Sequence, residues 1–273
     1  MGTWKELIRS RLPKAVKPHR ILRGPLRGAR LVTSWHDYPA AITGRTELPL
    51  LQWFSRTVEP SSTWLDVGAH YGYTTLHLSR LVAPGGQVIA FEPMLATAGS
   101  IAVTRHLNQA WNVRIVPIGL GAKHDLGMLE VPIERGMASP VAERPMMVDS
   151  ILLCAYDTLE AGLGIDHVDG VKIDVQGFEL DVLRGMREML LRDHPDLVVE
   201  LHQGVDRDAF ISFLADAGYL DPGMPIETGE VTPPYGDNLS YHFRPSGTGL
   251  TPEDDDRQVA GRIPSGRAGS SSP

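Results

Sequence analysis

The chain has 273 residues, enough for one large domain or for one domain with tails. Its longest uninterrupted apolar run, residues 151–156, is too short to cross a membrane as a helix. Because Cys154 is the single cysteine, a disulfide framework, a cysteine-built zinc site and an iron–sulfur cluster are excluded, and we expect a cytoplasmic location.

The net charge of -7 is unevenly distributed along the chain. Residues 1–30 hold nine Lys and Arg against one acid, whereas the remainder holds 17 basic and 32 acidic residues. This asymmetry predicts a basic N-terminal arm, residues 1–30, ahead of an acidic domain, residues 31–245. The arm is expected to be solvated or packed on the domain, with weak contact to an anionic membrane surface as the alternative. Residues 246–273 are rich in Ser, Gly, Pro and Asp, which predicts a disordered tail.

Strand-like and helix-like segments alternate along the domain, which predicts an α/β fold with a parallel sheet covered by helices on both faces. Alternating apolar and polar residues predict a final antiparallel strand at 239–243. Residues 119–156 fit the alternation poorly, and we expect a hairpin insertion there. The predicted parallel strands are residues 63–67, 87–91, 113–118, 171–175 and 197–201; the predicted helices are residues 72–82, 95–107, 178–189 and 209–217.

The most informative segment is Asp66-Val67-Gly68-Ala69-His70-Tyr71-Gly72, between the first predicted strand and its helix. Glycines at such a turn let the backbone approach a ligand closely, and the helix N-terminus offers free N–H groups. Twenty residues after Gly72, at the end of the second strand, Glu92 can accept hydrogen bonds from both hydroxyls of a ribose. The predicted cofactor-binding residues here are Asp66, Gly68, His70, Gly72 and Glu92.

The side chain at position 70 bears on which nucleotide is bound. A dinucleotide fingerprint has glycine at this point, because a pyrophosphate must lie against bare backbone. S-adenosylmethionine carries no phosphate and therefore tolerates His70. We favour S-adenosylmethionine as the cofactor, with a nicotinamide-dependent oxidoreductase as the alternative.

Three blocks, in this order, resemble the FkbM-type family of S-adenosylmethionine-dependent methyltransferases. They are residues 66–72, Phe91-Glu92-Pro93, and Val171-Lys172-Ile173-Asp174-Val175-Gln176-Gly177-Phe178-Glu179 with Leu183-Arg184-Gly185. The resemblance covers about residues 40–243. It implies a Rossmann-like class I methyltransferase sheet of seven strands with the last antiparallel, and it implies that Glu47 is a cofactor-binding acid. The family usually has Glu where this chain has Gln176.

Catalytic candidates are expected at the carboxyl ends of the predicted strands 171–175 and 197–201, where an open parallel sheet binds its ligands. Asp174 belongs to the most specific block and is predicted to position the methyl group or the acceptor. His202 lies just past its strand, where a neutral imidazole can take a proton from a hydroxyl. Its alternative is an ordinary surface or loop histidine.

Other charged residues near these strand ends are expected to be structural. Glu200 is predicted to pair with Lys172. Asp174, Glu179 and His202 carry the oxygen and nitrogen ligands that a metal ion needs, but no spacing demands one and no metal site is predicted. Trp64 and Cys154 are predicted to be core residues.

The sequence therefore predicts a methyltransferase, and the resemblance favours O-methylation of a hydroxyl on a small molecule or glycan, of sugar or polyketide type. A non-catalytic homologue that binds the cofactor is a further alternative, which Gln176 supports. Nucleic acid is disfavoured as a partner because the domain is acidic, although the basic arm suggests it. A valine in place of Gly68 is expected to weaken cofactor binding while the fold survives.

Overall fold

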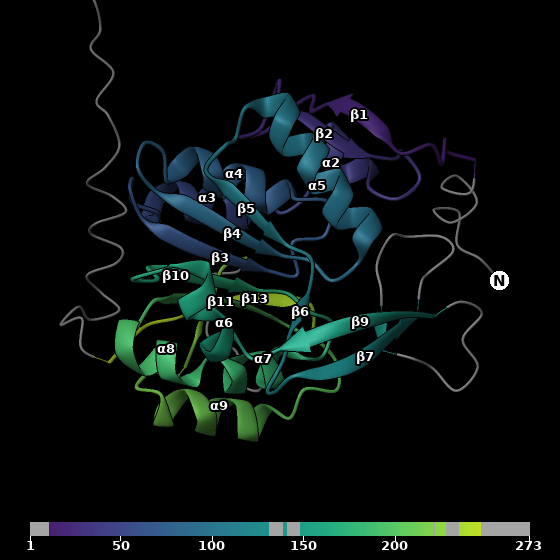
Figure 1. Cartoon of the computed structure of the whole chain (residues 1–273). Helices are drawn as coiled ribbons and strands as arrows, with labels where there is room; N and C mark the ends of the chain where they lie inside the picture. Colours follow the sequence, from purple (N-terminus) through teal and green to yellow (C-terminus); the bar gives the residue numbers. More distant parts are fainter. Residues whose placement is uncertain (1–10, 131–138, 141–147, 221, 228–234, 247–273) are drawn as a thin grey trace, which may run out of the picture.

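A seven-stranded sheet organises the chain in the computed structural model, which describes residues 11–130, 139–140, 148–220, 222–227 and 235–246 (Figure 1). The spatial order is β12 (Met224–Pro225), β13 (Leu239–Phe243), β11 (Asp196–Leu201), β10 (Gly170–Ile173), β3 (Thr63–Val67), β4 (Gln87–Phe91) and β5 (Val113–Val116). The five strands from β11 to β5 are parallel, and β13 is antiparallel to both of its neighbours. The predicted seven-stranded sheet with an antiparallel last strand is confirmed.

Helices cover both faces of this sheet (Figure 1). One face carries α3 (Leu48–Thr57), α4 (Tyr73–Leu81) and α5 (Leu95–Asn108); the other carries α6 (Tyr156–Leu163), α7 (Glu179–Gly185), α8 (Arg187–Asp193) and α9 (Arg207–Asp216). The short α2 (Pro39–Thr43) precedes α3.

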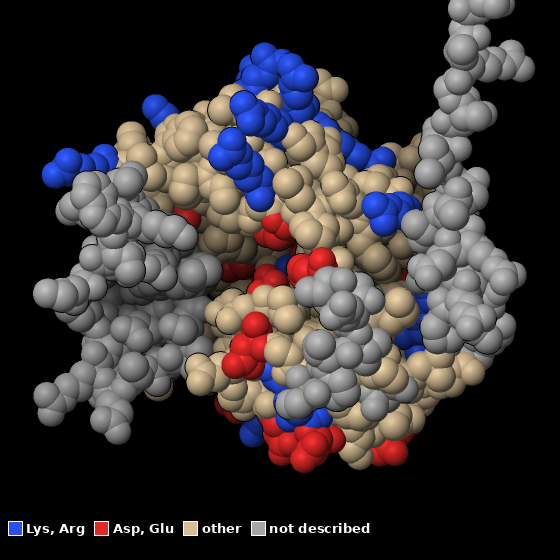
Figure 2. Space-filling view, turned by 180° about the vertical axis from the view of Figure 1, so that it is seen from behind, with Lys and Arg blue, Asp and Glu red and all other residues tan. Residues whose placement is uncertain are grey.

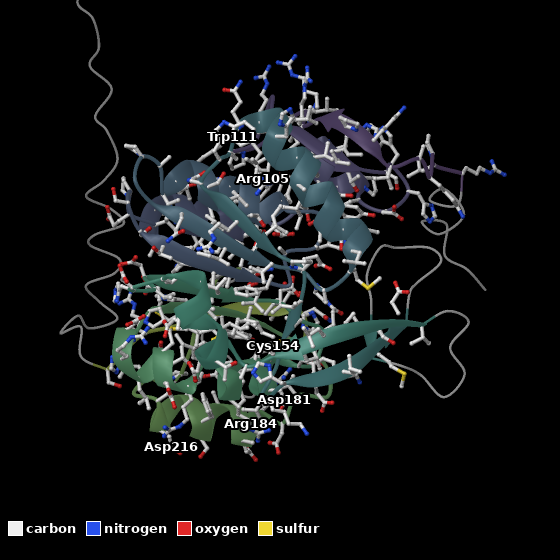
Figure 3. The ribbon with its side chains drawn as sticks, in the orientation of Figure 1. Arg105, Trp111, Cys154, Asp181, Arg184 and Asp216 are labelled. Atoms are coloured by element: carbon white, nitrogen blue, oxygen red, sulfur yellow. The ribbon has the colours of Figure 1, made fainter. Side chains whose placement is uncertain are left out.

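The alternation of side chains along each strand builds the two cores. Along β3, Leu65 packs in the core beneath α6–α9, and Trp64 packs in the core beneath α3–α5. Successive strand residues point to opposite faces, so both faces need apolar side chains in a sheet that is covered twice. Trp64 and Cys154 are buried, as predicted. Figure 3 labels Cys154.

The helix predicted over residues 178–189 is interrupted in the structure. α7 ends at Gly185, and α8 starts at Arg187. A Cβ on Gly185 would lie 2.0 Å from the carbonyl oxygen of Gly121, so only glycine lets these two backbone segments meet. Glycine also weakens a helix, which explains why one periodic pattern forms two short helices here.

A β-hairpin runs across the boundary predicted between residues 30 and 31. β1 (Lys17–Arg20) pairs with β2 (Arg30–Thr33), and Leu26 in the connection is fully buried. The backbone N–H of Val32 donates to Thr104 of α5 at 3.0 Å, so the hairpin is attached to the domain. The remaining parts of the predicted arm and tail, residues 1–10 and 247–273, lie outside the described residues.

The predicted insertion forms a small sheet of its own beside the carboxyl ends of the main strands (Figure 1). Its order is β6 (Gly119–Leu120), β9 (Val148–Cys154), β7 (Asp125–Glu130) and β8 (Ser139–Pro140), and β7 and β9 pair as an antiparallel ribbon. Among the described residues, none of the helices combines the length and apolar character that a membrane span requires.

The attachment of the β1–β2 hairpin can be tested with two leucines that share the connection. Leu26→Ala should lower the free energy of unfolding by about 2–5 kcal/mol, because it empties a fully buried site. Leu22→Ala, at a side chain 52% exposed, should change it by less than about 0.5 kcal/mol. Urea denaturation of both variants measures the difference, and equal values would show that the hairpin does not contribute to the core.

Candidate functional site

A cavity of about 520 Å³ opens at the carboxyl ends of β3, β4, β10 and β11. Its volume lies within the range of about 300–1,000 Å³ that small-molecule sites occupy. The glycine loop, the segment after β4 and the segment after β10 form one part of the wall, and the insertion forms another. Figure 2 shows acidic side chains gathered at a hollow in the middle of this face.

The glycine loop adopts left-handed backbone conformations at Gly68, His70 and Gly72, with φ of 79°, 52° and 78°. A Cβ on Gly68 would lie 1.9 Å from the carbonyl oxygen of Asp174, so glycine is required for the loops after β3 and β10 to touch. Gly68 and His70 line the cavity. Gly72 instead precedes α4 and packs against Ile101, so its predicted role in binding is indirect.

Asp66 lies beneath the glycine loop and does not line the cavity. Its carboxylate accepts a hydrogen bond from Thr75 at 2.5 Å and pairs with Lys172 at 3.3 Å. Lys172 also donates to the carbonyl oxygen of Gly68 at 3.3 Å and pairs with Asp174 at 3.6 Å. Asp66 therefore holds the loop in place through Lys172.

The ammonium of Lys172 is buried among carboxylates. Burial alone would lower its pKa, but Asp66, Asp174, Glu47 and Glu200 together raise the pKa above its usual value. Lys172 is therefore charged at neutral pH. Its ion pairs join it to Asp66 and Asp174, whereas the expected partner Glu200 lies against His202.

Glu92 lines the cavity and is tied to three donors of the protein. Its Oε1 accepts from the Met94 N–H at 2.9 Å and from the Thr97 hydroxyl at 2.8 Å, and its Oε2 accepts from the His70 N–H at 2.7 Å. Burial raises the pKa of Glu92, and these donors oppose that shift. A carboxylate has about four acceptor positions, so one on Oε2 remains. The predicted hydrogen bonds from both hydroxyls of a ribose stay a prediction.

Glu47 reaches the cavity from the residue that precedes α3. The Tyr38 hydroxyl donates to its Oε1 at 2.5 Å, and the Thr74 hydroxyl donates to its Oε2 at 2.6 Å. Burial raises the pKa of Glu47, and Lys172 and the two hydroxyls oppose the shift. Sequence reasoning missed Tyr38 and Thr74. Thr74 lies two residues after the glycine loop and could have been found there, but no motif marks Tyr38.

On the acceptor side, His202 is 5% exposed and its ring is held between carboxylates. Its Nδ1 lies 2.7 Å from Glu179, and its Nε2 lies 3.6 Å from Asp174 and 3.4 Å from Glu200. Gln176 also approaches Nε2, at 2.8 Å. These distances bring the predicted pair Asp174 and His202 together with a third group, Glu200. The cavity is lined by Asp174, Gln176 and Glu200, and His202 is not among its lining residues.

The surroundings of His202 favour a charged ring, whereas the predicted role as a base requires a neutral imidazole. Burial lowers the pKa of His202, but the carboxylates of Glu179, Glu200 and Asp174 outweigh that effect and raise it to about 10. A nitrogen that carries a proton cannot accept one from a hydroxyl, and the role of His202 as base stays a prediction.

The sequence matches the model of a protein family. The family described as Methyltransferase FkbM domain matches residues 66–220, more than half of the chain. The chain belongs to the FkbM methyltransferase family. This confirms the FkbM-type family of S-adenosylmethionine-dependent methyltransferases that the three motif blocks predicted. No curated protein matches the chain.

Several solved methyltransferase structures are similar to this FkbM-family chain. FkbM methyltransferase from Methylobacillus flagellatus KT is 17% identical, with a TM-score of 0.44, and the match covers 67% of this chain and 44% of that one. Precorrin-6y C5,15-methyltransferase from Geobacter metallireducens GS-15 is 16% identical (TM-score 0.44; 74% and 88% covered). Aeropyrum pernix fibrillarin, solved with natively bound S-adenosyl-L-methionine, is 15% identical (TM-score 0.45; 84% and 87% covered). The chain spans less than half the length of the Methylobacillus protein.

The contact between the glycine loop and Asp174 corrects the expectation for substitutions at position 68. Gly68→Ala should lower the free energy of unfolding by more than about 1–2 kcal/mol, because left-handed backbone strain adds to a backbone clash. Gly99→Ala is the control, since its Cβ would meet nothing within 4 Å and it lies inside α5. Urea denaturation compares the two. Equal stability of the variants would show that the loop does not need glycine at position 68.

Proposed function

We propose that this FkbM-family protein binds S-adenosylmethionine in the cavity and transfers its methyl group to a hydroxyl of a small molecule or glycan. The proposal rests on the charge of the residues that line the cavity. Among the described residues that line the cavity, one lysine, Lys172, faces five carboxylates: Asp37, Glu47, Glu92, Asp174 and Glu200.

This charge pattern favours a cationic ligand. S-adenosylmethionine has a sulfonium centre and an ammonium group, which an excess of carboxylates attracts. A nicotinamide dinucleotide carries a pyrophosphate, which the same carboxylates repel. The N–H of His70 is also engaged with Glu92, so the loop offers a phosphate fewer donors than a dinucleotide-binding turn does. The methyltransferase is therefore favoured over the nicotinamide-dependent alternative.

The position of the acidic groups suggests how the cofactor lies. Oε2 of Glu92 retains one acceptor position for a ribose hydroxyl, at the end of β4. Glu47 and Asp174 also line the cavity, and their carboxylates would attract the sulfonium and ammonium groups of the methionine arm. The cofactor supplies an electrophilic methyl group when it is bound. The chain then has to orient an acceptor hydroxyl and receive its proton, and the carboxylates of Asp174 and Glu200 lie where both are needed.

The acceptor side has an apolar wall. Met128, Leu129, Ile151 and Leu153 of the insertion line the cavity together with Phe178. An acceptor with an apolar body can bury that body against these side chains while it presents a hydroxyl to the carboxylates. A hydroxylated compound of polyketide type fits this wall, and a sugar could present its less polar face to it.

Nucleic acid is a second candidate acceptor, which one surface feature supports. Basic side chains gather over the β1–β2 hairpin, at the top edge of the molecule in Figure 2. Arg23 and Arg27 are exposed in the hairpin connection. Such a surface can contact a phosphate backbone, but the acidic cavity would repel phosphates close to the site of transfer.

Cofactor binding can be measured by calorimetry with S-adenosylhomocysteine. The intact chain should bind it, and Glu92→Gln should weaken binding about 10- to 100-fold, because a hydrogen bond to a charged group contributes about 1.5–3 kcal/mol. Glu188→Gln, at an exposed position of α8, is the matched control and should bind as the parent does. Binding of reduced nicotinamide dinucleotide, without binding of S-adenosylhomocysteine, would overturn the proposal.

Following a labelled methyl group from S-adenosylmethionine into a cell extract distinguishes a small-molecule or glycan acceptor from a nucleic-acid acceptor. We expect the label in low-molecular-mass compounds, and we expect it to survive mild base because methyl ethers resist hydrolysis. The double variant Arg23→Glu and Arg27→Glu should leave this incorporation unchanged. The second candidate would instead be supported if the label appears in the nucleic-acid fraction and if both the double variant and added salt reduce that label.

A further inference from the structure

Three side chains at the carboxyl ends of β10 and β11 are arranged as ligands around a common point. They are Asp174, Glu200 and His202, and one ligand atom of each lies within 4.8 Å of the others. The imidazole Nε2 of His202 is 3.6 Å from Oδ1 of Asp174 and 3.4 Å from Oε1 of Glu200. Ligands that bind one ion at about 2.1 Å lie about 3.0–3.4 Å apart, so small side-chain movements would complete the site.

We propose that Asp174, Glu200 and His202 bind a divalent cation of the Mn²⁺ type, which holds the acceptor hydroxyl beside the methyl donor. The inference rests on the proposed function for the identity of the acceptor, but not for the binding of the ion. Two carboxylates and one imidazole form a mixed oxygen and nitrogen set, which suits a transition ion better than Mg²⁺ or Ca²⁺.

A buried carboxylate orients the histidine by binding the ring nitrogen that faces away from Asp174 and Glu200. Glu179 is fully buried, and its Oε1 lies 2.7 Å from Nδ1 of His202. The same oxygen accepts the N–H of Gly177 at 3.0 Å, which fixes the carboxylate. A histidine held at Nδ1 by a carboxylate presents the lone pair of Nε2 to a metal ion. Here Nε2 points to the side where Asp174 and Glu200 lie.

The other groups that face the cluster leave it negatively charged. Lys172 pairs with Oδ2 of Asp174, which leaves Oδ1 directed at His202. Gln176 lies 2.8 Å from Nε2, and its carboxamide can turn its oxygen towards an ion. Close to this point the carboxylates of Asp174, Glu179 and Glu200 face two groups that can carry positive charge, Lys172 and the His202 ring. An ion bound at Nε2 would replace the proton of the ring and keep the carboxylates paired with positive charge.

The ion would also activate the acceptor hydroxyl in the proposed reaction. Asp174 and Glu200 line the cavity, so an ion between them is accessible to an acceptor. A divalent ion stabilises the alkoxide of a bound hydroxyl and lowers the pKa of that hydroxyl. The hydroxyl proton can then leave to water or to a carboxylate, while the oxygen forms a bond to the methyl carbon and the bond from carbon to sulfur breaks.

Binding of Mn²⁺ to the full-length chain, after dialysis against a chelator, tests the site. Electron paramagnetic resonance counts free and bound Mn²⁺, and we expect one bound ion per chain. Glu200→Gln and Asp174→Asn should each weaken this binding at least about 10-fold, and Glu179→Gln should weaken it about 10- to 100-fold by releasing the histidine. Asp216→Asn is the control, because Asp216 ends α9 at the outer edge of the molecule, away from the sheet (Figure 3).

Circular dichroism and urea denaturation of the same samples show that each variant is folded, and calorimetry of the parent chain with S-adenosylhomocysteine separates the two proposals. Mn²⁺ binding that falls in the three cluster variants but persists in Asp216→Asn supports the site. The site is overturned if the chain binds S-adenosylhomocysteine but no Mn²⁺, and also if Glu200→Gln binds Mn²⁺ as tightly as the control does. Mn²⁺ binding without S-adenosylhomocysteine binding would leave the cation site standing and remove the proposed function.

Discussion

The buried ammonium of Lys172 connects the two halves of the cavity. It pairs with Asp66 below the glycine loop, donates to the carbonyl oxygen of Gly68 in that loop, and pairs with Asp174 on the acceptor side. A charge buried this deeply is tolerated only when it is fully paired, so these groups constrain one another. The close backbone contact of Gly68 with Asp174 depends on the same arrangement. One buried ammonium therefore joins the glycine loop after β3 to the segment after β10.

Much of this fold could be predicted from the sequence, because the strands of a parallel sheet that is covered on both faces are short apolar runs, and amphipathic helices alternate with them. The bounds of β3 and β4 agree with the predicted residues 63–67 and 87–91. The β1–β2 hairpin was missed because its strands have four residues each and its sequence is dominated by basic residues. Its stability comes from burial of side chains such as Leu26 against the domain, which no local pattern reports.

The site was harder to predict, because it depends on which side chains of neighbouring elements meet. The two-residue period places Glu200 and His202 on one side of β11, but it does not say which carboxylate reaches the histidine at which nitrogen. In the structure Glu179 holds Nδ1 from behind and Glu200 faces Nε2 from the cavity. Glu179 therefore orients the histidine, whereas Glu200, which was expected to pair with Lys172, lies beside Nε2. The burial of Glu179 at the start of α7 decided this, and burial is a tertiary property.

The carboxylates around His202 determine which chemistry this part of the cavity can support. Carboxylates at both nitrogens keep the ring positively charged when no other cation is near, so it is a poor acceptor for the proton of an alcohol. The same carboxylates create a place where positive charge is stabilised, whether it is carried by a proton or by an ion. An ion has the advantage that it acts on the acceptor oxygen directly, since it lowers the pKa of the bound hydroxyl. The proposed ion would therefore let a cavity wall rich in carboxylates serve methyl transfer to oxygen.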